Sequence, residues 1–151
     1  MSPPHLLDTA ILLHWTRDSR QAKEIERQFH LEESRLRPLV CEVSWGEMRA
    51  FAKGRNWGAA KLKKLAEIQQ AVVSVDISDS RVVEAYADLQ TAARAKGWAI
   101  FNAKNDIWIA AAAHAAGAKL LTTDSDFKPV RDQLAWDVTI LEPTTGLIST
   151  A

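Results

Sequence analysis

The sequence predicts an α/β fold: a single domain with a central, mostly parallel sheet of about four to five strands flanked by helices. Two observations predict it. Short apolar runs recur along the chain, and longer segments with helical spacing of apolar side chains lie between them. Because parallel strands need long crossover connections, this alternation favours a parallel sheet covered on both faces. The length of 151 residues suits one domain, which we expect to span residues 1–142 and to precede a loose tail at 143–151.

The first half of the chain predicts three strands and four helices. The strands are expected around residues 6–7, 37–41 and 72–75, and the helices around 11–15, 19–29, 44–51 and 59–70. Ala22, Ile25 and Phe29 follow the i, i+3, i+7 spacing of an amphipathic helix. Ser44 and Glu47 match a capping box, in which the glutamate side chain would return to the serine backbone N–H.

The second half predicts two helices and two strands. Ser78 or Asp79 is expected to cap a long helix that Gly97 ends. Asn105 is expected to cap a helix over residues 106–116, and strands are expected at 119–122 and 138–141. The alternation of strand and helix therefore continues to the last strand.

Composition excludes several classes of protein. The 19 basic and 19 acidic residues cancel, so no overall charge attracts nucleic acid, yet six basic residues and no acid lie between Met48 and Ala66. The longest nearly uncharged stretch has 12 residues and includes a histidine, which is too short for a membrane span. With Cys41 as the sole cysteine and no signal-peptide pattern at the N-terminus, we expect a cytoplasmic protein without an internal disulfide.

Carboxylates recur where predicted strands end or helices begin. They are Asp8, Glu47, Asp106 and Asp124, with Asp126 close to the last. Ligands of open α/β sheets bind beyond the carboxyl ends of the strands, so these side chains are candidates for one site. Several carboxylates held together repel one another, and a hard divalent cation removes that cost. Oxygen ligands without a cysteine cluster or histidine pair favour Mg²⁺, with Mn²⁺ as a substitute.

Each acid also has a simpler interpretation when it is taken alone. Capping and metal roles are equally plausible for Glu47, and capping is the better single interpretation of Asp106. Asp8 could be a turn acid, and Asp124 and Asp126 could make Asx turns. The combination and order of the acids favour a metal site more than any one residue does.

Four segments make the chain resemble the PIN-domain ribonucleases, particularly the VapC-type toxins of bacterial toxin–antitoxin pairs. These segments are residues 6–9, 43–48, 105–111 and 121–127, and they follow the order and usual spacing of that family. The resemblance implies a PIN-like domain and Mg²⁺-dependent endonucleolytic cleavage of RNA. It implies catalytic roles for Asp8, Glu47, Asp106 and Asp124, and metal ligation by Asp8, Asp106, Asp124 and Asp126.

The resemblance also implies supporting residues and partners. Thr9, Asn105 and Thr123 are expected to help order the site. Known toxins of this kind often cut tRNA or rRNA, form homodimers, and are held inactive by a VapB-like antitoxin. From their charge, Arg49, Lys53, Arg55 and Lys104 are candidates for RNA contacts.

Other functions remain alternatives at this point. A PIN nuclease in RNA processing, outside any toxin pair, would carry the same acids. A haloacid-dehalogenase-like phosphatase needs a second Asp two residues after the first, where Ala10 stands. A receiver domain could use Asp76 as its phosphoacceptor, but Asp8 lacks an acidic neighbour. A non-catalytic binding module is the last alternative, and the intact acids argue against it.

Overall fold

A computed structural model describes residues 2–151 of the chain. Within these residues, five short strands form one sheet in the order β3–β2–β1–β4–β5, and every neighbouring pair is parallel. The strands are β1 (His5–Leu7), β2 (Leu39–Cys41), β3 (Val73–Val75), β4 (Lys119–Thr122) and β5 (Val138–Ile140). The predicted α/β class with a parallel sheet is confirmed.

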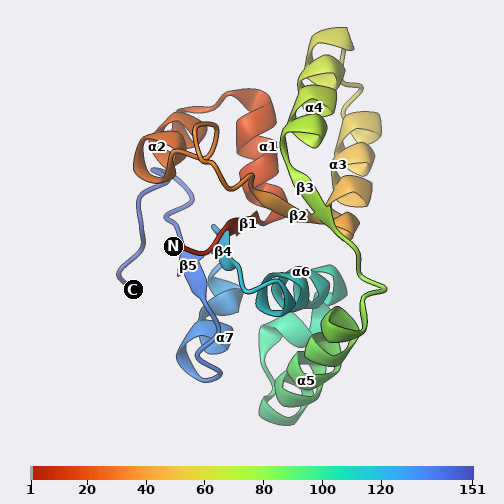
Figure 1. Cartoon of the computed structure of the whole chain (residues 1–151), viewed down its shortest axis with the longest axis vertical. Helices are drawn as coiled ribbons and strands as arrows, with labels where there is room; N and C mark the ends of the chain where they lie inside the picture. Colours follow the sequence, from red (N-terminus) through yellow and green to blue (C-terminus); the bar gives the residue numbers. More distant parts are fainter. Residues whose placement is uncertain (1) are drawn as a thin grey trace.

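Helices cover both faces of the sheet (Figure 1). One face carries α1 (Thr9–Arg17), α2 (Arg20–Phe29), α3 (Glu42–Gly54) and α4 (Ala59–Ala71). The other carries α5 (Ser80–Lys96), α6 (Lys104–Ala115), α7 (Lys128–Asp132) and the 3₁₀ turns η1 (Ala99–Asn102) and η2 (Ser125–Phe127). In the part of the chain that the structure describes, no helix has both the length and the apolar character to cross a membrane.

The two faces of the sheet have separate hydrophobic cores because successive strand residues point to opposite sides. Leu6 and Leu120 pack with the alanine-rich α6 and with α5. Leu7 and Leu121 pack with α1 to α4 instead. The strands are fully buried at these positions, which explains their continuous apolar runs.

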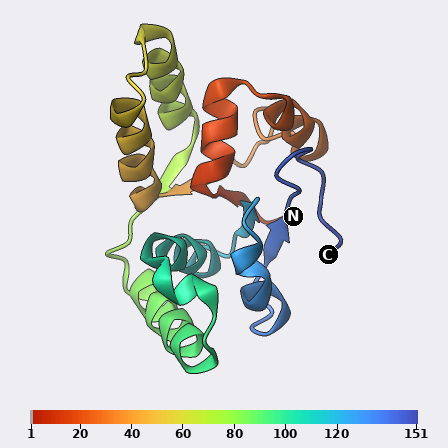
Figure 2. The same cartoon turned by 180° about the vertical axis from the view of Figure 1, so that it is seen from behind.

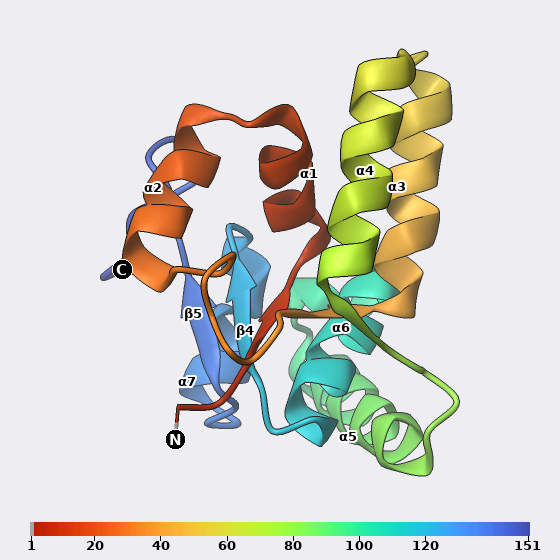
Figure 3. The same cartoon turned by 45° about the horizontal axis from the view of Figure 1, so that its top comes forward.

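Strand order places a crevice at the carboxyl edge of the sheet. β1 lies between β2 and β4, so the chain moves away from β1 in both directions along the sheet. Such a switch point is where open α/β sheets bind ligands. Beside it, α3 and α4 form a pair that extends beyond the rest of the domain (Figure 3).

Local signals for the long helices are confirmed in part. Asp79 caps α5 through a hydrogen bond from the Arg81 N–H, and Gly97 ends it with a left-handed φ of 69°. Asn105 is not a cap, because α6 begins at Lys104. The predicted capping box is also wrong: α3 begins at Glu42, so Ser44 lies inside the helix and its hydroxyl contacts another segment.

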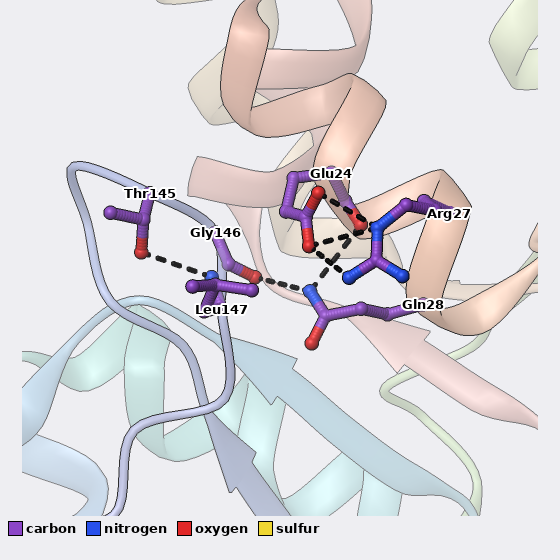
Figure 4. Close-up of polar contacts among 6 residues, drawn as sticks. All are labelled: Glu24, Arg27, Gln28, Thr145, Gly146 and Leu147. Carbon is purple, nitrogen blue, oxygen red and sulfur yellow. Dashed lines mark hydrogen bonds and ion pairs between the residues drawn. The ribbon is translucent and has the colours of Figure 1, made fainter.

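The expectation of a loose tail at residues 143–151 needs correction. Leu141 and Ile148 form an antiparallel bridge, and the tail lies beside α2 (Figure 2). Gln28 of α2 donates a hydrogen bond of 2.7 Å to the Gly146 carbonyl (Figure 4). Gly146 has a φ of 78°, and a Cβ there would lie 2.9 Å from the Gln21 carbonyl oxygen. This close approach requires glycine, and it fixes the tail in place.

Candidate active site

Four of the predicted carboxylates line one cleft of about 480 Å³ at the carboxyl edge of the sheet. They come from four segments: Asp8 follows β1, Glu47 lies on α3, Asp106 lies in the first turn of α6, and Asp124 follows β4. The remaining lining residues are neutral: Thr9, Ala10, Leu13, Phe51, Thr123 and Ser125. The cleft is therefore strongly acidic, with no basic side chain among the residues that line it.

Asp8 is the most constrained of these acids. It is 5% exposed and caps α1, with Oδ1 accepting a hydrogen bond of 2.8 Å from the Thr9 N–H. Its Oδ2 accepts one of 2.7 Å from the Thr122 hydroxyl. Burial raises the pKa of Asp8 to about 6 although both hydrogen bonds lower it. The protein thus holds a carboxylate rigidly where a charge is costly.

Thr122 is a site residue that the sequence did not reveal. Its buried hydroxyl donates to Asp8 and accepts a hydrogen bond of 3.0 Å from the Asp124 N–H, so it connects two of the acids. Sheet register places it there, because Leu7 pairs with Leu121 and the next residues on the two strands are Asp8 and Thr122. The sequence indicated its neighbour Thr123, which lines the cleft.

Glu47 is held by a second polar chain. The Thr9 hydroxyl lies 2.8 Å from Glu47 Oε1 and 2.9 Å from the Ser44 hydroxyl. Since a carboxylate only accepts, Thr9 donates its single hydroxyl proton to Glu47. The tertiary contact to Thr9 thus replaces the local capping box that we expected for Ser44 and Glu47.

Asp106 has a different environment. Its carboxylate makes no hydrogen bond to any other group within residues 2–151, and it is half-buried at the start of α6. Burial, followed by the negative charges of Asp8, Asp124, Glu47 and Asp126, raises the pKa of Asp106 to about 7. The first helical turn favours an anion, but that effect is small beside desolvation and repulsion.

Asp124 forms the Asx turn that was one of its two predicted roles, since its Oδ1 accepts a hydrogen bond of 2.8 Å from the Asp126 N–H. Asp126 itself is exposed and does not line the cleft, although its charge acts on Asp106. Asn105 is exposed and lies outside the cleft as well. The site therefore centres on four acids, with Asp126 at its margin.

The predicted RNA-contact residues have different surroundings, and none of them lines this cleft. Arg49 and Lys53 line a separate hollow of about 380 Å³ with Trp57. The Lys104 ammonium bonds to the Phe101 carbonyl and lies 3.6 Å from the centre of its ring. Arg55 approaches a cleft residue, since its guanidinium carbon lies 5.2 Å from the centre of the Phe51 ring.

The donor chemistry fits a hard divalent cation, but the ligands do not form a compact shell. Among residues 2–151, no three His, Cys, Asp or Glu side chains lie close enough together to hold a metal ion. Burial, and after it the charges of the neighbouring acids, raises the pKa of Asp8 and of Asp106, and a bound cation would offset both effects. The receiver alternative gains nothing, because Asp76 is exposed and lies outside this cleft.

Comparisons with known proteins agree with the fold. The VapBC2 structure from Rickettsia felis, bound to a promoter DNA fragment, aligns with a TM-score of 0.69 at 20% identity, covering 83% of this chain and 92% of that one. A toxin–antitoxin complex from Klebsiella pneumoniae aligns with a TM-score of 0.64 at 20% identity, covering 92% and 97%. FitAcB from Neisseria gonorrhoeae gives 0.64 at 20% identity, covering 93% and 98%.

These likenesses establish a shared fold. No curated protein matches the sequence. Residues 5–133 match the family described as the PIN domain, which includes all four acids of the cleft and most of the chain. The chain therefore belongs to the PIN domain family.

Proposed function

We propose that this protein is a metal-dependent endoribonuclease that hydrolyses RNA phosphodiester bonds. The observation that carries the proposal is the gathering of Asp8, Glu47, Asp106 and Asp124 from four separate segments around one cleft. Capping explains some of these acids when each is taken alone. It does not explain why four acids share one cleft, where burial raises the pKa of Asp8 and Asp106. Such an arrangement is typical of a functional site.

In this proposal, Mg²⁺ or Mn²⁺ is the cofactor, and Asp8, Asp106 and Asp124 are its ligands, with Asp126 as an auxiliary. When bound, the cation would activate a water molecule and stabilise negative charge on the phosphate oxygens. Thr122 keeps Asp8 oriented, and α6 presents Asp106 from the other side. Binding of the cation would require these ligands to come closer together than they lie in the structure.

Glu47 has a separate role in the proposed reaction. Its Oε1 accepts the Thr9 hydrogen bond, and its Oε2 is left to orient the attacking water and accept a proton from it. Thr9 and Ser44 fix the direction of the carboxylate and so reduce the reorganisation that the reaction requires. Thr9 is thus a positioning residue, and the acids carry the chemistry.

We further propose that the protein is the toxin of a VapBC-type pair, with a VapB-like antitoxin and a homodimeric state. Support comes from the solved structures that share its fold, several of which are toxin–antitoxin complexes. A PIN nuclease of RNA processing is the alternative. A neighbouring gene for a small DNA-binding protein, whose product blocks cleavage when it is co-purified, would distinguish the toxin from the processing enzyme.

Cleavage of total cellular RNA by purified protein tests the activity. Reactions with Mg²⁺, with Mn²⁺ and with EDTA are compared, using Asp106→Asn as the inactive variant and Asp88→Asn as the control. Asp88 is exposed on α5, so its substitution removes the same charge without touching the cleft. We expect discrete products that require metal and are lost only in Asp106→Asn. Equal cleavage by Asp106→Asn, with or without EDTA, would refute the proposal.

A further inference from the structure

An acidic cleft that binds RNA must overcome its own repulsion of phosphates. The ten residues that line this cleft include four acids and no base. A metal cofactor offsets the charge at the scissile phosphate, but the phosphates on either side still approach a negative surface. The substrate strand therefore needs a cation and a neutral contact surface directly beside the acids.

Phe51 provides the neutral surface. It lies on α3 one turn after Glu47, lines the cleft, and is only half-buried. Leu13 and Ala10 of α1 line the same cleft, so three of its ten lining residues are apolar. A partly exposed ring inside a polar cleft is suited to stack on an unpaired base, which is how proteins commonly grip single-stranded RNA.

Arg55 provides the cation. Its guanidinium carbon lies 5.2 Å from the centre of the Phe51 ring, and its side chain forms no ion pair within residues 2–151. Arg55 directly follows the last residue of α3, which separates it from the basic residues within the helix. Phe51 is rotated roughly 40° from Glu47 about the helix axis, but Arg49 and Lys53 are rotated by roughly 200° and 240°. Those two residues line the separate hollow with Trp57.

We propose that Phe51 and Arg55 form a substrate subsite for single-stranded RNA, which rests on the nuclease function proposed above. A base adjacent to the cleavage point stacks on Phe51, and Arg55 binds the phosphate of that nucleotide. The subsite selects unpaired RNA over a duplex, because a base within a helix cannot present its face to the ring. Arg49 and Lys53 line the separate hollow and are therefore not part of this subsite.

Two readouts separate the ring from the cation. Binding of a short labelled single-stranded RNA of mixed sequence is measured at several salt concentrations. The protein carries Asp106→Asn and the buffer contains Mg²⁺, so that the RNA is cut too slowly to affect the binding measurement. We expect Phe51→Leu to weaken binding about tenfold without changing the salt dependence, and Phe51→Tyr to retain binding. Arg55→Gln should lower the slope of log affinity against log salt by about 0.7, the value of one phosphate contact on a single strand.

The matched controls are Arg94→Gln and Lys96→Gln, which remove the same charge from exposed positions on α5 outside the cleft and should leave affinity and slope as in the parent. Thermal unfolding shows whether Phe51→Leu is folded. Arg55→Gln is a second, independent variant, because Arg55 is exposed and its substitution leaves the hydrophobic core unchanged. If Phe51→Leu and Arg55→Gln both bound RNA as tightly as the parent, the subsite would be overturned but the nuclease proposal would remain intact. Failure of the parent protein to bind or cleave RNA would overturn both.

Discussion

The two walls of the cleft hold their acids in different ways. The hydrogen-bonded wall comprises Asp8, Thr9, Ser44, Glu47 and Thr122, and its members are joined by contacts of 2.7 to 2.9 Å. The α6 wall presents Asp106, whose carboxylate is fixed only by the buried helix behind it. One wall is organised before any cofactor binds, and the other has a carboxylate that a proton or a cation would neutralise. Each prediction below tests this contrast.

The largest expected effect is on catalysis, where both walls matter. Asp8→Asn and Asp106→Asn should each lower the rate of RNA cleavage by about 100-fold or more, which corresponds to about 2.7 kcal/mol in the activation barrier. This loss is measured from the initial rates of cleavage with Mg²⁺, normalised to the amount of folded protein. Asp88→Asn, which lies outside the cleft on α5, should cleave like the parent. If only one of the two substitutions lowered the cleavage rate, the acid of the other wall would not be needed, and one wall alone would carry the chemistry.

The second effect concerns pH and the metal-free protein. The folded pKa of Asp8 and of Asp106 exceeds the value of 3.8 for a free carboxyl, so the native state binds protons more tightly than the unfolded chain. The contribution of these two groups to stability is then greatest below about pH 4, and it is lost as the pH rises through about 6 for Asp8 and about 7 for Asp106. For the buried Asp8, the change from 3.8 to about 6 corresponds to about 3 kcal/mol.

Thermal unfolding in EDTA across this pH range, with and without Asp106→Asn, measures the effect. The variant should become progressively more stable than the parent between about pH 4 and pH 7, because it lacks the charge that is costly to bury. Mg²⁺ should raise the melting temperature of the parent more at pH 8 than at pH 5. A stability difference between parent and variant that stays constant over this interval would contradict the electrostatic description of the α6 wall.

The third effect isolates the hydrogen-bonded wall. Thr122→Val keeps the shape of the side chain but removes the donor to Asp8 and the acceptor for the Asp124 N–H, so unfolding should cost about 1–3 kcal/mol less. The pKa of Asp8 should rise further, which shifts the acidic limb of the pH–rate profile to higher pH. Thr122→Ser should restore both properties. Thr123→Val, at the adjacent half-exposed position, is the matched control, and an equal loss there would contradict the role of Thr122.

The contrast between the walls also explains what the sequence could predict. The α/β class and the strand-end position of Asp8 and Asp124 follow from local patterns of apolar residues, which survive in the folded protein. Thr122 could not be chosen over Thr123, because its partnership with Asp8 depends on the register of β4 against β1. Register is a pairing between segments more than 100 residues apart, and no local pattern encodes it.

Errors of prediction arose where a distant contact replaced a local one. Ser44 has the spacing of a capping residue relative to Glu47, yet α3 begins earlier and both side chains contact Thr9 instead. The tail was expected to be loose because its sequence has no apolar period. The tail is ordered because Gly146 packs closely against the backbone of α2, at a distance that would not accommodate a Cβ.

The smallest expected effect lies at the far end of the hydrogen-bonded wall. Ser44→Ala removes one hydroxyl contact to Thr9 inside a helix, where alanine is the better helix former, so we expect a net loss of stability of only about 0.5–1 kcal/mol. Thr9 should still donate to Glu47, and the cleavage rate should stay within about twofold of the parent. Thr9→Val is the contrasting variant, because it removes the contacts to both Ser44 and Glu47 and should lower the rate more than Ser44→Ala. Urea unfolding and initial rates measure the two effects separately. If Ser44→Ala lowered the rate as far as Thr9→Val, the orientation of Glu47 would depend on the whole polar chain and not on its single bond to Thr9.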